Sequence, residues 1–219
     1  MRLLAVVALA LLSTGCGQSP QPIAASSSGE AVSRQIDPAR IDRARDELPD
    51  GYEVAAFAGP PAPITLWSFG DEAVSVPSQC LALATPAVGS AATSGWSASG
   101  PGGIVYAVVA RSSHREAPDP ALLAECARWT LTSGRATGTV TARSGPIIDT
   151  VRTVAMSTVA TVVVEGGTET RLRAETLVAY LVGYVCFVAL ITDPGSSSPT
   201  LGAVFATDLL NSALSAMRG

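Results

Sequence analysis

Two extended segments near the C-terminus constrain the fold more than any other part of the chain. Residues 157–165 and 170–192 are rich in β-branched and apolar side chains, and Gly166 and Gly167 separate them. Segments of this composition, joined by a short glycine-containing connection, are typical of a β-hairpin. The sequence therefore predicts a long hairpin whose second strand comprises residues 170–192.

The second strand of this hairpin changes character along its length. Arg171, Arg173 and Glu175 alternate with apolar residues, so we expect one face of its outer part to be solvated. Residues 177–191 are apolar on both faces, which predicts cover on both sides. A transmembrane helix is the alternative for this run, but the run is shorter than the about 20 residues that a bilayer requires, and Gly183 interrupts it.

Shorter patterns elsewhere predict further strands and helices. The expected strands are 52–57, 64–69, 104–110 and a hairpin over 129–143, and the expected helices are 37–48, 77–83, 118–129 and 201–217. Residues 89–103 form an expected loop that contains Trp96. The expected buried side of the closing helix consists of Leu201, Val204, Phe205, Leu209, Ala213, Leu214 and Met217. We therefore expect the α+β class: a mainly antiparallel sheet with a long C-terminal hairpin, helices packed on it and a closing C-terminal helix.

The N-terminus has the pattern of a bacterial export signal. Arg2 precedes an apolar run over residues 3–12, and the small residues 13–15 stand directly before Cys16. The tetrapeptide Ser-Thr-Gly-Cys at 13–16 resembles the lipobox of bacterial lipoproteins, and this resemblance implies a diacylglycerol on the thiol of Cys16. A plain secretory signal with an incidental cysteine is the alternative.

This interpretation divides the chain into three parts. Residues 1–15 are the expected lipoprotein signal peptide, 16–35 a flexible tether rich in Ser, Pro and Gln, and 36–219 a single α+β domain. The protein is then expected on the extracytoplasmic side of the cell membrane, where its lipid holds it.

Composition narrows the classes of partner. Hydrophobic residues make up 47% of the chain and charged residues 15%, which is typical of a globular domain. The net charge of -4 argues against a nucleic-acid partner, which would require a basic face. We therefore expect no nucleic-acid partner.

Three cysteines remain if Cys16 carries a lipid. Cys80 and Cys126 are the better disulfide pair, because each stands beside a helix-like segment near a polar boundary. Cys186 lies within a continuous apolar run, which indicates a buried free thiol. Three scattered cysteines and one histidine have no metal-ligand spacing, so we expect no metal site and no cofactor.

The sequence offers poor candidates for catalysis. The nearest match to a nucleophile elbow is Gly-Trp-Ser-Ala-Ser at 95–99, which lacks the final glycine. A Ser-His-Asp triad could use only His114, which lies in a polar segment. We therefore predict no catalytic residues and no enzyme, and a hydrolase is the weakest functional hypothesis.

Several motifs carry a family resemblance. Leu-Pro-Asp-Gly-Tyr at 48–52, Thr-Asp-Pro-Gly at 192–195 and Phe-Ala-Thr-Asp-Leu-Leu at 205–210 accompany the lipobox, Cys80 and Cys126. Together they resemble a family of uncharacterised mycobacterial and related actinobacterial lipoproteins of unknown function. The chain is also distantly similar to the extracytoplasmic sensor-like domain of the mycobacterial receptor kinase PknH. The resemblance implies an extracytoplasmic location and the architecture of the domain, with a sensor-like role by analogy.

The leading hypothesis is therefore a binding or sensing module of the cell envelope. Its ligand would be a small molecule, an envelope lipid or glycan, or a partner protein. We expect any pocket where Tyr180 and Tyr184, which share a face of the predicted long strand, meet Trp96 or the closing helix. The alternative for both tyrosines is that they complete the core. The alternative for the whole protein is an accessory or scaffold lipoprotein without a small ligand.

Overall fold

The computed structural model describes residues 35–87, 93–112, 117–192, 195 and 198–219. The chain divides into two units, Met1–Ser33 and Arg34–Gly219, and the second unit is described by itself. The predicted signal peptide, the tether as far as residue 34, Cys16 and His114 lie outside the described residues.

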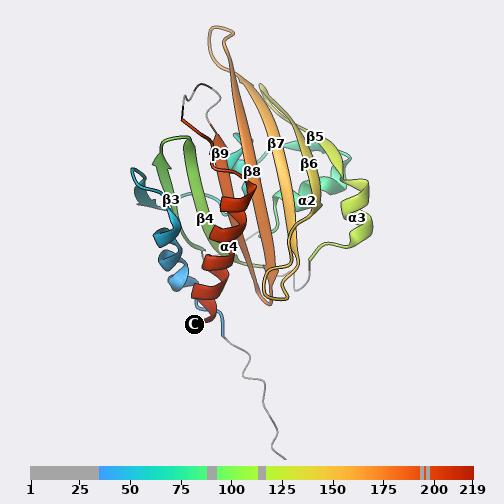
Figure 1. Cartoon of the computed structure of the whole chain (residues 1–219). Coiled ribbons are helices and arrows are strands. Elements are labelled where there is room, and N and C mark those ends of the chain that lie inside the picture. Colours follow the sequence, from blue (N-terminus) through green and yellow to red (C-terminus); the bar gives the residue numbers. More distant parts are fainter. Residues whose placement is uncertain (1–34, 88–92, 113–116, 193–194, 196–197) are drawn as a thin grey trace, which may run out of the picture. The chain divides into compact units, whose positions relative to one another are not determined.

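The described residues form a nine-stranded antiparallel sheet (Figure 1). Its strands follow the spatial order β1, β3, β4, β9, β8, β7, β6, β5, β2. Their bounds are β1 Glu53–Ala56, β2 Val74–Val76, β3 Thr93–Gly100, β4 Gly103–Arg111, β5 Arg128–Ser133, β6 Ala136–Ser144, β7 Thr153–Val163, β8 Glu169–Leu181 and β9 Tyr184–Thr192. The long β7–β8 hairpin lies inside this sheet, as predicted.

Short helical elements and one longer helix pack on the sheet. They are η1 Pro38–Glu47 and η2 Ser78–Cys80, which are 3-10 helices, and the α-helices α1 Pro63–Leu66, α2 Leu81–Ala84, α3 Pro120–Glu125 and α4 Ala203–Arg218. The α+β class and the closing C-terminal helix are therefore confirmed. No helix in the described part of the chain is long and apolar enough to cross a membrane.

The sheet separates two hydrophobic cores. On its first face, Trp67, Phe69 and Trp129 are buried against Phe187 of β9, beneath the segments that contain α1, η2, α2 and α3. On its second face, Trp96 of β3 is buried beneath η1 and α4. Because side chains alternate along a strand, the central strands β4, β8 and β9 contribute to both cores, which explains their apolar composition.

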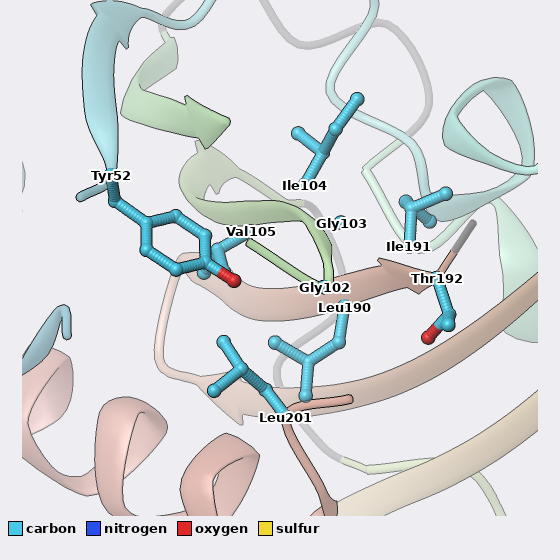
Figure 2. Close-up of a pocket in the computed structure, with 9 residues that line it drawn as sticks. All are labelled: Tyr52, Gly102, Gly103, Ile104, Val105, Leu190, Ile191, Thr192 and Leu201. Atoms are coloured by element: carbon cyan, nitrogen blue, oxygen red, sulfur yellow. The ribbon is translucent and has the colours of Figure 1, made fainter. Parts of the chain in front are cut away.

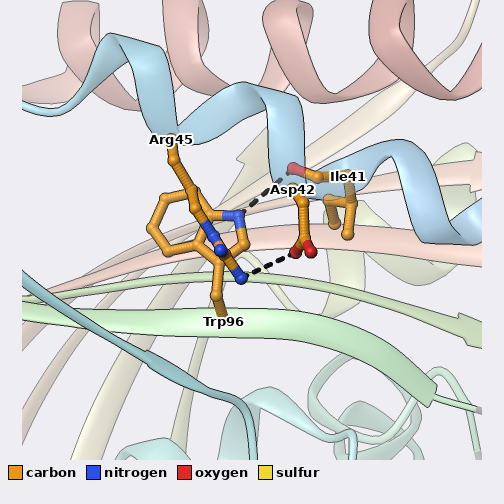
Figure 3. A network of polar contacts seen from close by, with 4 residues as sticks. All are labelled: Ile41, Asp42, Arg45 and Trp96. Atoms are coloured by element: carbon orange, nitrogen blue, oxygen red, sulfur yellow. Dashed lines mark hydrogen bonds and ion pairs between the residues drawn. The ribbon is translucent and has the colours of Figure 1, made fainter.

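A buried tryptophan ties η1 to the second face. The Nε1–H of Trp96 donates a hydrogen bond to the carbonyl oxygen of Ile41 at 3.2 Å, and the Trp96 side chain is fully buried (Figure 3). Arg45 forms an ion pair with Asp42 at 2.8 Å on the same helix. Asp37 caps the start of η1 by accepting from the amide of Ala39, as the Asp-Pro pair in the sequence predicts.

The predicted long strand over 170–192 is wrong. It is two antiparallel strands, β8 and β9, because the chain reverses at Val182 and Gly183. Gly183 has a φ of +76°, which a residue without a Cβ adopts at no steric cost. Leu181 pairs with Tyr184 across this tight turn.

Three other predicted elements also differ from the structure. The helix expected over 118–129 is the shorter α3, and Trp129 already belongs to β5. Residues 64–69 do not form a strand, because Pro63 starts the short helix α1. Much of the predicted loop 89–103 is the strand β3, and its small residues permit a close approach to β4: a Cβ on Gly95 would lie 2.5 Å from the carbonyl oxygen of Ala107. In α4, Val204 is 76% exposed rather than buried.

Candidate functional site

The structure does not bring the predicted pocket residues together. Trp96 belongs to the second core, Tyr184 packs against that same core, and Tyr180 belongs to the first core on the opposite side of the sheet. The prediction that both tyrosines share a face is wrong because the turn at Gly183 pairs Tyr184 with Leu181, and side chains alternate between faces from Tyr180 to Leu181. The ring of Tyr184 instead lies under the guanidinium of Arg111, 5.5 Å from the ring centroid.

Tyr180 lies in the core. Its hydroxyl is buried and has no hydrogen-bond partner among the described residues, and burial raises its pKa well above the ordinary value. A phenol in this environment stays protonated at physiological pH. It therefore supplies neither a base nor a nucleophile.

The cysteines are arranged as the sequence predicts. Cys80 at the end of η2 and Cys126 after α3 form a disulfide with a Cα–Cα distance of 5.5 Å. Cys186 is a free, fully buried thiol. Burial raises the pKa of Cys186 to about 12, so the side chain is a thiol and not a reactive thiolate.

The Gly-Trp-Ser-Ala-Ser motif has no elbow geometry. Ser97 lies in the middle of β3 and pairs with Tyr106 of β4, whereas a nucleophile elbow requires a sharp turn from a strand into a helix. In the part of the chain that the structure describes, no three His, Cys, Asp or Glu side chains lie close enough together to hold a metal ion.

Two hollows lie near the ends of the helices on the second face. The one in Figure 2, between Tyr52, the β3–β4 turn and Leu201, has a volume of about 10 Å³, room for about one water molecule. The other, at the start of η1, has a volume of about 440 Å³ and contains Asp37, Arg40 and Tyr184. Its charged groups Asp37 and Arg40 pair with each other at 3.2 Å, so their opposite charges offset each other within the hollow.

A more apolar hollow of about 210 Å³ lies beside α3. Pro118, Leu123, Ile147 and Val154 line it, together with the exposed Arg152. This volume is below the roughly 300 Å³ at which pockets for drug-sized ligands begin. The hollow could therefore hold a fragment of a ligand only.

Half of the second face has no helix on it. η1 and α4 cover β3, β4, β9 and the adjoining half of β8, and α4 leaves β6 and β7 uncovered on the same side (Figure 1). On β5, β6 and the outer parts of β7 and β8, the second-face side chains are mostly exposed or half-buried. This uncovered area spans four neighbouring strands, and we take it as the candidate site.

The side chains of this area stand in three rows across the strands. In the order β5, β6, β7, β8, the rows are Thr132, Thr137, Thr161, Arg171; then Thr130, Thr139, Val159, Arg173; then Arg128, Thr141, Ser157, Glu175. We call these rows, together with the adjacent Arg143 of β6, the threonine–arginine surface. Neighbouring strands lie about 4.8 Å apart, so each row contains two or three closely spaced hydroxyls and ends in a charged group on β8.

The charged groups of this surface are largely unpaired. Its four arginines are exposed, and none of them forms an ion pair with another described residue. The carboxylate of Glu175 accepts a hydrogen bond from the Ser157 hydroxyl at 2.7 Å. Glu169 lies on the same face of β8, two residues before Arg171. The surface therefore has an excess of positive charge, in a chain whose net charge is -4.

Sequence reasoning found only part of this surface. The alternation of Arg171, Arg173 and Glu175 with apolar residues indicates a solvated face, which the structure confirms. The threonines of β5 and β6 also alternate, in the segment over 128–144. Their alignment with β7 and β8 depends on strand register, which the sequence alone does not reveal.

Comparison with known proteins identifies the family. The chain belongs to the family described as a domain of unknown function, DUF5642, whose model matches residues 37–218. Its fold is similar to the X-ray structure of an uncharacterised protein from Mycobacterium smegmatis, an Rv0999 orthologue, with a TM-score of 0.60 and 19% sequence identity over 84% of this chain and 98% of the other. At this identity the similarity shows the fold alone. No curated protein matches the chain.

Proposed function

We propose that this DUF5642 protein is an extracytoplasmic lipoprotein, anchored through a lipid on Cys16, that binds a partner through the threonine–arginine surface. It is a binding module of the cell envelope and not an enzyme. The anchor rests on the lipobox-like sequence that ends at Cys16. The role of the domain rests on the shape and chemistry of its uncovered half-sheet.

The observation that carries the binding role is the contrast between this surface and the hollows. Small ligands are usually held in concave, largely apolar pockets, whereas two of the hollows described above are small and the third is lined mainly by polar and charged groups. The threonine–arginine surface spans four strands and offers unpaired hydroxyl and guanidinium groups. A flat polar area of this kind favours a macromolecular partner over a small ligand.

A second candidate function is sensing of a small ligand at the hollow beside α3. Arg152 is the one charged residue of a mostly apolar lining, which would suit the anionic end of a short apolar molecule. The volume of this hollow is about 210 Å³, which makes small-ligand sensing the weaker of the two candidate functions. A scaffold role without any small ligand agrees with the partner-binding proposal.

The anchor is tested by replacing the acceptor cysteine. In a mycobacterial host grown with labelled palmitate, we expect the wild-type protein to carry label and to remain in the membrane fraction. Cys16→Ala should lose both properties. Labelling of the Cys16→Ala variant, or a soluble wild-type protein that retains residues 1–15, would contradict the proposed anchor.

The binding role is tested by co-sedimentation with an isolated, delipidated cell-envelope fraction. Thr139→Tyr places a bulky side chain at the centre of the surface while keeping a residue that strands favour. Thr200→Tyr makes the same exchange at an exposed position before α4 and is the matched control. We expect Thr139→Tyr to abolish co-sedimentation and Thr200→Tyr to preserve it. Equal behaviour of the two variants would refute the assignment of the surface.

A further inference from the structure

The charge of the threonine–arginine surface indicates the chemistry of its partner. Arg171 and Arg173 end two of the rows on β8, while Arg128 and Arg143 stand at the β5–β6 end. All four guanidinium groups are exposed and lack ion pairs with other described residues. Guanidinium groups bind carboxylates and phosphates through paired hydrogen bonds, so the surface is complementary to an anion.

The hydroxyls between the arginines indicate a partner that is also rich in hydroxyls. Thr130, Thr132, Thr137 and Thr139 occupy adjacent positions on β5 and β6, and each hydroxyl can donate one hydrogen bond and accept others. Their methyl groups, with Val159 and the exposed Val74 and Val76 of β2, provide apolar patches between the hydroxyls. Sugars present the same mixture of hydroxyl groups and C–H faces.

Other classes of macromolecule fit this surface less well. Protein interfaces depend on aromatic anchors, whereas threonine is under-represented among the residues that dominate their affinity. Proteins that lie on membranes insert Trp, Phe or Leu side chains into the lipid interface. The threonine–arginine surface contains none of these residues.

We propose that the threonine–arginine surface binds an anionic polysaccharide, whose carboxylate or phosphate groups pair with the arginines while its sugar hydroxyls contact the threonine rows. This inference rests on the proposed function and names the partner class of the same surface. Attraction between exposed charges is screened by salt, so the affinity should fall as ionic strength rises.

The test uses the full-length protein in mild detergent and polymers of defined chemistry. Fluorescently labelled carboxymethyl-dextran and dextran phosphate are the anionic probes, and unmodified dextran of the same length is the neutral probe. Vesicles of phosphatidylglycerol and of phosphatidylcholine test the alternative of a membrane surface. Each probe is titrated at low and at physiological ionic strength.

Two variants and one control identify the surface. Arg171→Ala with Arg173→Ala should weaken binding of an anionic dextran roughly two- to thirtyfold, because it removes two exposed ion pairs with the polymer and each such pair contributes about 1.4- to fivefold. Thr137→Val with Thr139→Val keeps the side-chain shape, removes two hydroxyls and should weaken binding about threefold or more. Arg43→Ala removes an exposed arginine from η1, outside the surface, and should leave binding within about twofold of wild type.

Each outcome decides the proposal. Salt-sensitive binding of an anionic dextran that both surface variants weaken supports it. Binding of phosphatidylglycerol vesicles but of no polymer overturns it in favour of a membrane surface, and equal binding of neutral and anionic dextran overturns the role of charge. If no polymer binds while Thr139→Tyr still abolishes envelope co-sedimentation, the polysaccharide inference fails and the proposed function stands.

Discussion

Removal of the disulfide should destabilise the domain strongly. Cys80 and Cys126 join two short elements, η2 and α3, that cover the first face of the sheet. α3 has six residues and none is fully buried, although the half-buried Leu122 and Leu123 pack against the first core, so its own packing is limited. We therefore expect the double variant Cys80→Ala/Cys126→Ala to lose stability, with the largest local effect in α3.

The magnitude follows from the length of the closed loop. The two cysteines are 46 residues apart, and closing a loop of this length lowers the entropy of the unfolded chain by an amount equivalent to roughly 4 kcal/mol at 25 °C. A domain of this size has a free energy of unfolding of about 5–15 kcal/mol, so the loss is a large part of the total. The melting temperature should fall by roughly 8–16 °C.

The assay is urea unfolding followed by far-UV circular dichroism and tryptophan fluorescence. Wild-type protein in reducing agent lacks the cross-link but keeps both sulfur atoms, which the double variant lacks. If the cross-link is the main cause, reduction should lower the free energy of unfolding by about as much as the double substitution does. Cys186→Ala leaves the disulfide in place, so in reducing agent it should lose about as much stability as wild type, whereas the stability of the double variant should not respond to the reducing agent. A double variant within about 1 kcal/mol of wild type would refute the reasoning, because it would show that packing alone holds α3 and η2.

Three further predictions concern buried side chains. Trp96→Phe removes the donor to the Ile41 carbonyl and should cost about 2 kcal/mol of unfolding free energy, measured by urea unfolding; no loss would contradict the role of this bond. Tyr180→Phe removes a buried hydroxyl without a partner, so stability should stay constant or rise by up to about 1 kcal/mol, and a clear loss would reveal a hidden partner. Burial raises the pKa of the Cys186 thiol from 9.0 to about 12. The contribution of this thiol to the free energy of unfolding is therefore intact below pH 9 and is lost as the pH rises toward 12. In urea unfolding above pH 9, wild type should lose up to roughly 1.4 kcal/mol per pH unit relative to Cys186→Ala.

The class of the fold was predictable because its main signals are local. The double-glycine turn at Gly166 and Gly167 lies between two segments of strong strand character, and it forms the turn of the β7–β8 hairpin. Asp37 and Asp119, each followed by proline, cap the starts of η1 and α3 through their own side chains. In each case a few adjacent residues determine the conformation.

The errors have a common physical origin in tertiary context. β3 contains the small residues Gly95, Ser97 and Ser99, which have low strand propensity, but hydrogen bonding to β1 and β4 on its two sides makes it a strand. The turn at Gly183 is hidden because apolar residues flank it on both sides, as expected where β8 and β9 are buried on both faces. The same error also led to the prediction that Tyr180 and Tyr184 share a face. The turn makes Tyr184 the partner of Leu181, whose side chain lies on the opposite face from that of Tyr180.

The position of α4 and the extent of the threonine–arginine surface have one cause in the sequence of β8. Its second-face residues change from Arg171, Arg173 and Glu175 to the buried Leu177 and Ala179, and α4 covers the sheet only from this change onward. Solvation alone requires polar side chains on the uncovered strands, and threonine meets this requirement because it also favours strands. Solvation does not require unpaired arginines both on β8 and on β5 and β6. Stability should therefore tolerate Arg171→Ala with Arg173→Ala within about 0.5 kcal/mol, and a binding role is supported only if the same variant loses its affinity for an anionic polymer.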